Sequence, residues 1–114
     1  MVYRVLREAQ VTRDLDLIED YLVATYLSLG EDEEGATSRA TARIEDAQSY
    51  IRSFANHPHR GTEHPRIHHG LRTVTSNRFI YYFEIDEPRS EVRVLAVFFG
   101  GVNHQKQILD RLQH

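Results

Sequence analysis

The stretch that decides the fold runs from Gly70 to Gly100 and reads GLRTVTSNRFIYYFEIDEPRSEVRVLAVFFG. It contains three runs rich in Val, Ile, Tyr, Phe and Thr, separated by the short polar links Ser76-Asn77 and Glu87–Ser90. Runs of this length and composition, punctuated by Asn, Pro and Ser, are typical of consecutive β-hairpins. The stretch therefore predicts a three-stranded antiparallel meander.

The central run of this meander is apolar on both sides. Because side chains alternate along a strand, one face carries Phe79, Tyr81, Phe83 and Ile85, and the other carries Ile80 and Tyr82. A strand with one wet face would alternate apolar and polar residues, so this strand needs cover on both faces. We expect helices of the same chain on one face and a candidate partner surface on the other.

Composition narrows the class of protein. A chain of 114 residues is expected to form one domain, spanning residues 1–114. The absence of cysteine excludes a disulfide framework and a thiolate zinc site. No run has the length of a signal or membrane segment, so we expect a soluble, cytoplasmic protein. The net charge is −3, and the mildly basic C-terminal half, residues 58–114, is too weakly charged to indicate a nucleic-acid partner by itself.

Two amphipathic helices are predicted before the meander. Thr12 is a candidate N-cap for the first helix, which runs to about Gly30 with Asp14 and Asp16 in its first turn. Its apolar stripe consists of Val11, Leu15, Ile18, Leu22, Tyr26 and Leu29. A second stripe, ending near Asn56, consists of Ala36, Ala40, Ile44, Ala47, Ile51 and Phe54. The two stripes predict a helical hairpin over residues 12–56.

The remaining segments complete an α+β fold. A short strand over Val2–Leu6 is expected to pair with the meander, because its backbone groups need partners. After Gly100-Gly101 a C-terminal helix is expected, with Asn103 as its cap and Val102, Ile108, Leu109 and Leu112 as its apolar residues. The order is β-α-α-β-β-β-α, a twisted antiparallel sheet of about four strands with the helical hairpin on one face.

This order, with Gly70-Leu-Arg72 opening the meander and Arg78–Asp86 as its central strand, resembles the toxins of the RelE/ParE superfamily of bacterial toxin–antitoxin modules. Further features resemble its ParE, plasmid-stabilisation branch: Asp14-Leu15, Ile18 and Tyr21 in the first helix, Pro58 and Gly61 before the meander, and Val92–Val97 in the last strand. The resemblance implies a type II toxin that needs no cofactor. It also implies a cognate antitoxin and either a toxin–antitoxin hetero-oligomer or a homodimer.

The resemblance leaves the toxin's target open between two chemistries. ParE-type toxins are described as DNA gyrase poisons that act by binding, whereas RelE-type toxins cleave mRNA on the ribosome. Cleavage needs an acid, a base and cations for the phosphorane charge. The meander has no lysine, and Ile80 stands where the nucleases place an arginine. We therefore expect a gyrase inhibitor; the alternatives are a ribosome-dependent mRNA endonuclease, with catalytic candidates Arg72, Arg78 and His104, or a catalytically silent interaction module.

The residues expected to bind a partner are Arg72, Arg78, Ile80, Tyr82 and Phe99. If Ser76-Asn77 is a two-residue turn, Thr75 pairs with Arg78 and Arg72 pairs with Tyr81, which places the two arginines on opposite faces. The outer sheet face and the C-terminal helix would form a groove for an antitoxin helix or strand. Alternatively, the C-terminal helix only completes the core there.

Histidines gather in the irregular segment from His57 to His69, which also holds Pro58, Gly61 and Pro65. Imidazoles suit zinc, nickel and copper, but a metal site needs ligands in fixed positions. A loop rich in proline and glycine does not supply them, so we expect no metal site and treat these histidines as solvated or pH-sensitive groups.

Overall fold

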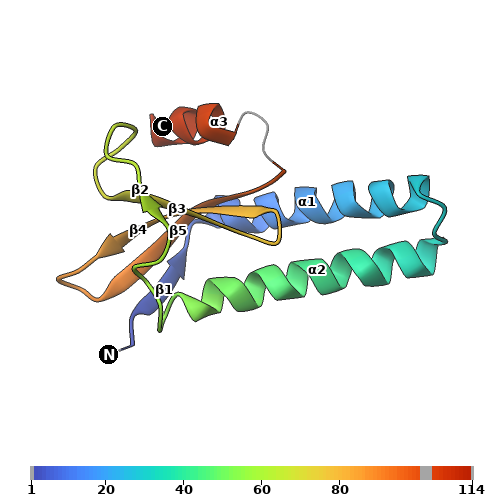
Figure 1. The fold of residues 1–114 in the computed structure, drawn as a ribbon, viewed down its shortest axis with the longest axis horizontal. Helices are drawn as coiled ribbons and strands as arrows, with labels where there is room; N and C mark the ends of the chain where they lie inside the picture. The colour runs from blue at the N-terminus through green and yellow to red at the C-terminus, as the bar shows by residue number, and fades with distance from the viewer. Residues whose placement is uncertain (1, 101–103, 114) are drawn as a thin grey trace.

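The structure is a computed structural model that describes residues 2–100 and 104–113 (Figure 1). Its elements are β1 (Arg4–Arg7), α1 (Ala9–Ser28), α2 (Glu33–Ser53), β2 (Thr62–Glu63), β3 (Leu71–Ser76), β4 (Phe79–Asp86), β5 (Glu91–Phe99) and α3 (His104–Leu112). The predicted order and the α+β class are confirmed, with the two-residue strand β2 added. Two residues are too few to produce a periodic pattern, which is why the sequence did not reveal this strand.

The sheet has the strand order β1-β5-β4-β3-β2 and is mixed rather than wholly antiparallel. The predicted meander of β3, β4 and β5 is confirmed, but β1 runs parallel to β5, with Arg4 opposite Glu91. The direction follows from where α1 must start. The amide of Glu8, just before α1, donates to the carbonyl of Val94 in the middle of β5, 2.9 Å away. The chain reaches this position because β1 runs parallel to β5.

The turn between β3 and β4 differs from the predicted one by one residue. Ser76 pairs with Phe79, so the turn residues are Asn77 and Arg78, with φ angles of 51° and 72°. Two left-handed residues define a type I′ turn, which suits the twist of a hairpin. The carbonyl of Asn77 accepts a 2.9 Å hydrogen bond from Arg43, which holds the turn against α2. Arg72 therefore lies opposite Phe83 rather than Tyr81.

The helical hairpin forms as predicted, with corrections at the ends of α1. This helix begins at Ala9 with Glu8 as its N-cap, so Thr12 lies inside it and is not the cap. The early start follows from good helix formers directly after β1, and it buries Val11 completely. At the other end, Leu29 lies past the helix and is 73% exposed, contrary to the predicted stripe. The stripe of α2 is confirmed in full, and Asp32 caps this helix by accepting from the amide of Gly35.

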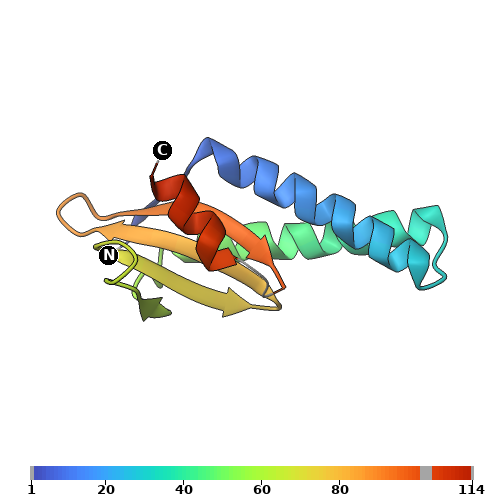
Figure 2. The same ribbon diagram turned by 90° about the horizontal axis from the view of Figure 1, so that it is seen from above.

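The sheet is covered on both faces, as the apolar pattern of β4 requires (Figures 1 and 2). The helical hairpin and the face of Phe79, Tyr81 and Phe83 form the larger core cluster. The opposite, outer face forms a smaller cluster with α3, consisting of Leu71, Ile80, Tyr82, Ala96, Phe98 and Ile108. In the part of the chain that the structure describes, no helix combines the length and apolarity needed to cross a membrane.

Two glycines with the same backbone angle provide a test of the β2–β3 contact. Gly61 and Gly70 both have φ of 81°, but a Cβ on Gly61 would lie 2.1 Å from the carbonyl oxygen of Thr73, whereas one on Gly70 would meet nothing within 4 Å. We expect Gly70→Ala to cost about 1 kcal/mol from the left-handed backbone alone. Gly61→Ala should cost about 2–4 kcal/mol, because overpacking adds to that strain. Urea unfolding measures both, and equal costs would contradict the close approach.

Candidate functional site

The outer face of the sheet lies under a single short helix. Ile108 of α3 is only 1% exposed and packs among Ile80, Tyr82 and Phe98. Ile80 and Tyr82, both predicted to bind a partner, are 6% and 1% exposed. They can therefore contact a partner only where α3 does not cover them. In this structure α3 completes the core, which is the second of the two roles predicted for the C-terminal helix.

A buried ion pair joins α3 to α1. The carboxylate of Asp14 is 4% exposed, accepts a hydrogen bond from the amide of Val97 at 2.9 Å, and also accepts two from the guanidinium of Arg111. The same guanidinium lies 5.1 Å from the ring centroid of Phe98. A buried carboxylate is tolerated because it is paired and hydrogen-bonded. The sequence analysis placed Asp14 in the first turn of the helix and did not find this pair, although Asp14 shares the helical phase of Val11 and Ile18.

The amide that Asp14 binds belongs to an unpaired edge. β1 pairs only with Glu91–Val94, so the rest of β5 has no strand on that side. The amide of Gly100 donates to the carbonyl of Arg78 on the β4 side, and peptide groups alternate along a strand. The amide of Val97 therefore points away from β4, toward the open edge. The Asp14 carboxylate supplies the acceptor that a neighbouring strand would otherwise provide.

A second polar contact fixes the start of α3. The Tyr82 hydroxyl lies 2.7 Å from Nδ1 of His104. Burial raises the pKa of the Tyr82 phenol and keeps it neutral, and the imidazole tautomer decides which of the two groups donates. An imidazole that accepts at Nδ1 carries its proton on Nε2. His104 is thus an oriented imidazole on the outer face.

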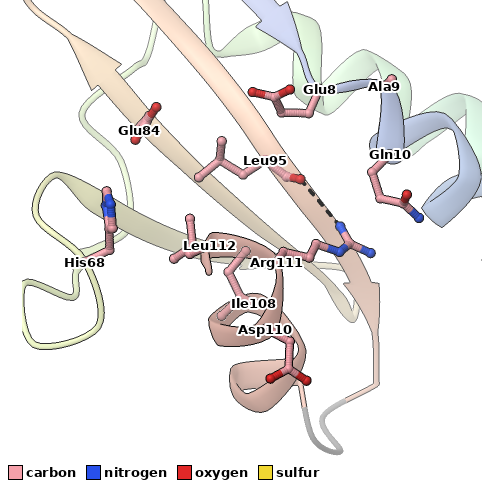
Figure 3. A pocket seen from close by; sticks show the side chains of 10 residues that line it. All are labelled: Glu8, Ala9, Gln10, His68, Glu84, Leu95, Ile108, Asp110, Arg111 and Leu112. Atoms are coloured by element: carbon pink, nitrogen blue, oxygen red, sulfur yellow. Dashed lines mark hydrogen bonds between the residues drawn. The ribbon is translucent and has the colours of Figure 1, made fainter. Parts of the chain in front are cut away.

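A groove of about 680 Å³ runs between α3, the start of α1 and the outer face of the sheet (Figure 3). Its apolar lining comes from Leu95, Ile108 and Leu112, and its acidic lining from Glu8, Glu84 and Asp110. Figure 3 shows the guanidinium of Arg111 directed to the carbonyl of Leu95, and the same group is already paired with Asp14. Glu8 is paired with Arg93 at 3.5 Å, as Arg111 is paired with Asp14, so Glu84 and Asp110 are the lining carboxylates without an ion pair among the described residues. These two carboxylates make the groove unfavourable for a phosphate backbone.

The structure does not bring the three catalytic candidates together. Arg72 donates to the Glu63 carboxylate at 2.8 Å and to the carbonyls of His59 and Arg60 at 2.9 and 3.3 Å, so it ties the irregular segment to β3. Arg72 lies near the start of β3 and Arg78 in the turn that follows it, and the strand from Arg72 to Ser76 alone spans about 13 Å at 3.3 Å per residue. His104 lies on α3, over Tyr82. Among the described residues, no hydrogen bond, ion pair or ring contact joins any two of these three side chains.

Arg78 and Phe99, both predicted binding residues, do lie together. The guanidinium carbon of Arg78 is 5.1 Å from the ring centroid of Phe99. Arg43 approaches the same ring at 5.3 Å, and the ring of Tyr21 lies 6.1 Å away. Sequence reasoning did not connect Arg43 with this group, because the contact depends on how α2 crosses the hairpin turn.

The histidines of the irregular segment make polar contacts with protein groups. His64 lies 2.6 Å from the hydroxyl of Thr73, and His59 pairs with Glu87 in the β4–β5 turn. Glu87 also accepts a 2.9 Å hydrogen bond from the hydroxyl of Tyr3. Over residues 2–100 and 104–113, no three His, Cys, Asp or Glu side chains converge as metal ligands would.

The comparisons with known proteins concern the fold. No protein-family model matches the sequence, and no curated protein matches it. A chain of the chromosomal ParDE TA system from P. aeruginosa matches with a TM-score of 0.67 and 18% identity, over 88% of this chain and 98% of that chain. A chain of the toxin–antitoxin complex RelBE2 from Mycobacterium tuberculosis matches with a TM-score of 0.50 and 13% identity, over 87% of this chain and 99% of that chain.

These matches confirm the resemblance at the level of fold: the chain has the fold of the RelE/ParE toxin superfamily. The match spans the helical hairpin and the sheet together, since it covers nearly nine tenths of the chain. At such low identity it assigns no role to any single residue.

The buried ion pair predicts a strong energetic coupling between α1 and α3. Arg111→Ala should destabilise the protein by about 3 kcal/mol, because it leaves the Asp14 carboxylate buried without its counter-charge. In an Asp14→Asn background the same change should cost about 1 kcal/mol, since the neutral amide can still accept from Val97. A double-mutant cycle by urea unfolding measures the difference. Arg89→Ala, at a side chain that is 75% exposed, serves as the control, and additive costs would contradict the pairing.

The cluster of Tyr3, His59 and Glu87 predicts a dependence of stability on acid pH. The hydrogen bond from His59, and then that from Tyr3, lowers the pKa of Glu87 below its ordinary value of 4.5. A depressed folded-state pKa gives stability that is present above the ordinary value and is lost as the pH falls through the folded value. The free energy of unfolding should therefore fall more steeply below about pH 5 in the wild type than in Glu87→Gln. Parallel curves for the two proteins would refute this assignment.

Proposed function

We propose that this protein is the toxin of a type II toxin–antitoxin system, that it is ParE-like, and that it acts by binding DNA gyrase. A cognate antitoxin would neutralise it by covering part of its surface. The observation that carries the proposal is the match to the ParDE system, which extends over 88% of this chain and 98% of that one. A match of this extent relates the fold as a whole rather than a shared motif.

Three features of the described residues support a binding mechanism over bond chemistry. Arg72 is used in holding the irregular segment, and Arg78 lies in the turn beyond the other end of β3. The groove beside α3 is acidic, so it would repel an mRNA backbone. A toxin that inhibits by binding needs none of the convergent acid, base and cation groups that cleavage requires.

The second candidate function is a ribosome-dependent mRNA endonuclease. The oriented imidazole of His104 favours it, because Tyr82 holds Nδ1 and leaves Nε2 free for acid–base work. Among the described residues, no arginine forms a contact with this imidazole, and Arg111 of the same helix is paired with Asp14. A nuclease would therefore have to obtain its cations from the ribosome.

The purified protein tests the proposal in a gyrase assay. We expect lost supercoiling or trapped DNA cleavage complexes, and rescue of both by the protein encoded beside it. His104→Ala should retain the inhibition within about fivefold, because most residues of a protein interface cost less than about 1 kcal/mol when they are truncated. Circular dichroism controls for folding of the variant.

Two outcomes would overturn the proposal. Gyrase that works normally at high protein excess, with mRNA cut on ribosomes, would select the endonuclease, and His104→Ala should then reduce cleavage about 100-fold or more. Silence in both assays would leave a protein that uses this fold only for association.

A further inference from the structure

A second surface lies where α1, the end of β5 and the β3–β4 turn meet (Figures 1 and 2). We call it the α1–β5 surface and define it by Leu17, Tyr21, Arg43, Arg78 and Phe99. A hollow of about 240 Å³ lies along its apolar part, lined by Leu17, Tyr21 and Phe99, and Arg111 of α3 stands between this hollow and the acidic groove. The surface is therefore partly concave, and it combines apolar side chains with two arginines.

The apolar side chains of this surface are exposed to solvent, and the core of the fold does not use them. Leu17 and Tyr21 are 66% and 58% exposed and lie one helical turn apart on α1, so they share a face. The ring of Phe99, half-buried at the end of β5, lies 6.1 Å from that of Tyr21 and continues the patch. The fold already buries the other stripe of α1, and it gains little from these two side chains. Exposed apolar groups gathered in this way mark interaction sites.

Its cationic part consists of two arginines without a carboxylate. Among the described residues, neither Arg43 nor Arg78 forms a salt bridge; Arg43 donates to the neutral hydroxyl of Tyr26 at 3.1 Å and to the carbonyl of Asn77 at 2.9 Å. Both guanidinium groups lie over the ring of Phe99, at 5.3 and 5.1 Å. The left-handed backbone of Arg78, with φ of 72°, is strained for a residue with a side chain and holds the group there.

The neighbouring charges select the class of partner. Asp16 and Asp20 are exposed on α1 beside Leu17 and Tyr21, so a long polyanion such as a nucleic acid would bring phosphates against carboxylates. A protein segment avoids this repulsion, because it can place one or two carboxylates on the arginines and apolar side chains on α1. Interfaces of this kind are enriched in Tyr, Phe and Arg.

We propose that the α1–β5 surface binds an acidic amphipathic segment of the antitoxin. Apolar side chains of this segment cover Leu17, Tyr21 and Phe99, and a carboxylate pairs with Arg78 and Arg43. The identity of the partner rests on the proposed function, whereas the chemistry of the segment rests on the surface alone.

A random peptide library displayed on phage, selected against the immobilised full-length protein, tests the chemistry. We expect enrichment of peptides that combine Leu, Ile or Phe with Asp or Glu at three- or four-residue spacing. The best peptide is then synthesised, together with a version carrying Gln for Glu and Asn for Asp. Its Kd is measured by fluorescence anisotropy against the wild type and its variants.

Arg78→Ala and Tyr21→Ala should each weaken binding of this peptide about tenfold, as expected for loss of a charge-assisted contact or an aromatic anchor. The neutral peptide should bind the wild type about tenfold more weakly and should be insensitive to Arg78→Ala. Arg89→Ala, which removes the same charge from the β4–β5 turn, should bind like the wild type. Added salt should weaken binding to the wild type more than binding to Arg78→Ala.

Enrichment of basic or uncharged peptides, or equal loss in Arg78→Ala and Arg89→Ala, would overturn the proposal. A selection that yields no peptide whose binding depends on Tyr21 would also contradict the proposal. None of these outcomes depends on toxicity. A protein that inhibits gyrase but fails this test keeps its proposed function, and one that passes without affecting gyrase loses only that function.

Discussion

The structure depends on one constraint, which is that β4 is buried on both of its faces. Its residues Phe79–Phe83 are all 6% exposed or less, so alternate side chains face opposite layers. Each such side chain contributes about 1.5–3 kcal/mol when it leaves water, and exposure of either face would forfeit two or three of them. The chain meets this requirement unequally. A long helical hairpin covers one face, and a nine-residue helix covers the other.

The small apolar contact between α3 and the sheet explains why the protein keeps a buried carboxylate, that of Asp14, beneath this helix. α3 contributes one buried side chain, Ile108, to the outer cluster, which is a small apolar contact for holding a helix on a sheet. The ion pair of Asp14 and Arg111 adds a directional contact, and its carboxylate also satisfies the amide of Val97 on the unpaired half of β5. One carboxylate thus connects α1, the edge of the sheet and α3. A hydrophobic residue at this position would fill the space but would leave the amide without an acceptor.

Much of this fold could be predicted from the sequence, because apolar periodicity reports which faces are buried. The alternation in β4 and the stripe of α2 are correct residue by residue. Features that depend on contacts between distant segments could not be predicted in this way. The turn at Asn77 and Arg78 is held by Arg43, and the direction of β1 is set by the start of α1.

In the candidate site, too, the sequence predicted individual residues but not the contacts between distant segments. Arg78 and Phe99 were predicted as binding residues and do lie together, but Arg43 joins them from another helix. Arg72 was predicted from a motif, and the structure shows that its donors are occupied by Glu63 and two backbone carbonyls. A motif identifies a residue type, whereas only the fold shows which of its hydrogen bonds are already made.

The two surfaces described here have opposite charge: the groove beside α3 is acidic and the α1–β5 surface is cationic. Neither surface suits a nucleic acid, because carboxylates line the groove and Asp16 and Asp20 are exposed on the α1 side of the α1–β5 surface. Both surfaces suit a protein that binds through several small contacts. The account depends most on the Asp14 carboxylate, which holds the unpaired edge of β5, and amide hydrogen exchange measured by NMR tests this contact directly at Val97. We predict that this edge amide is protected on the order of a thousandfold or more, like the amides within the β4–β5 ladder. Exchange at the rate of an unstructured peptide would show that the carboxylate does not hold the edge, and would contradict the account.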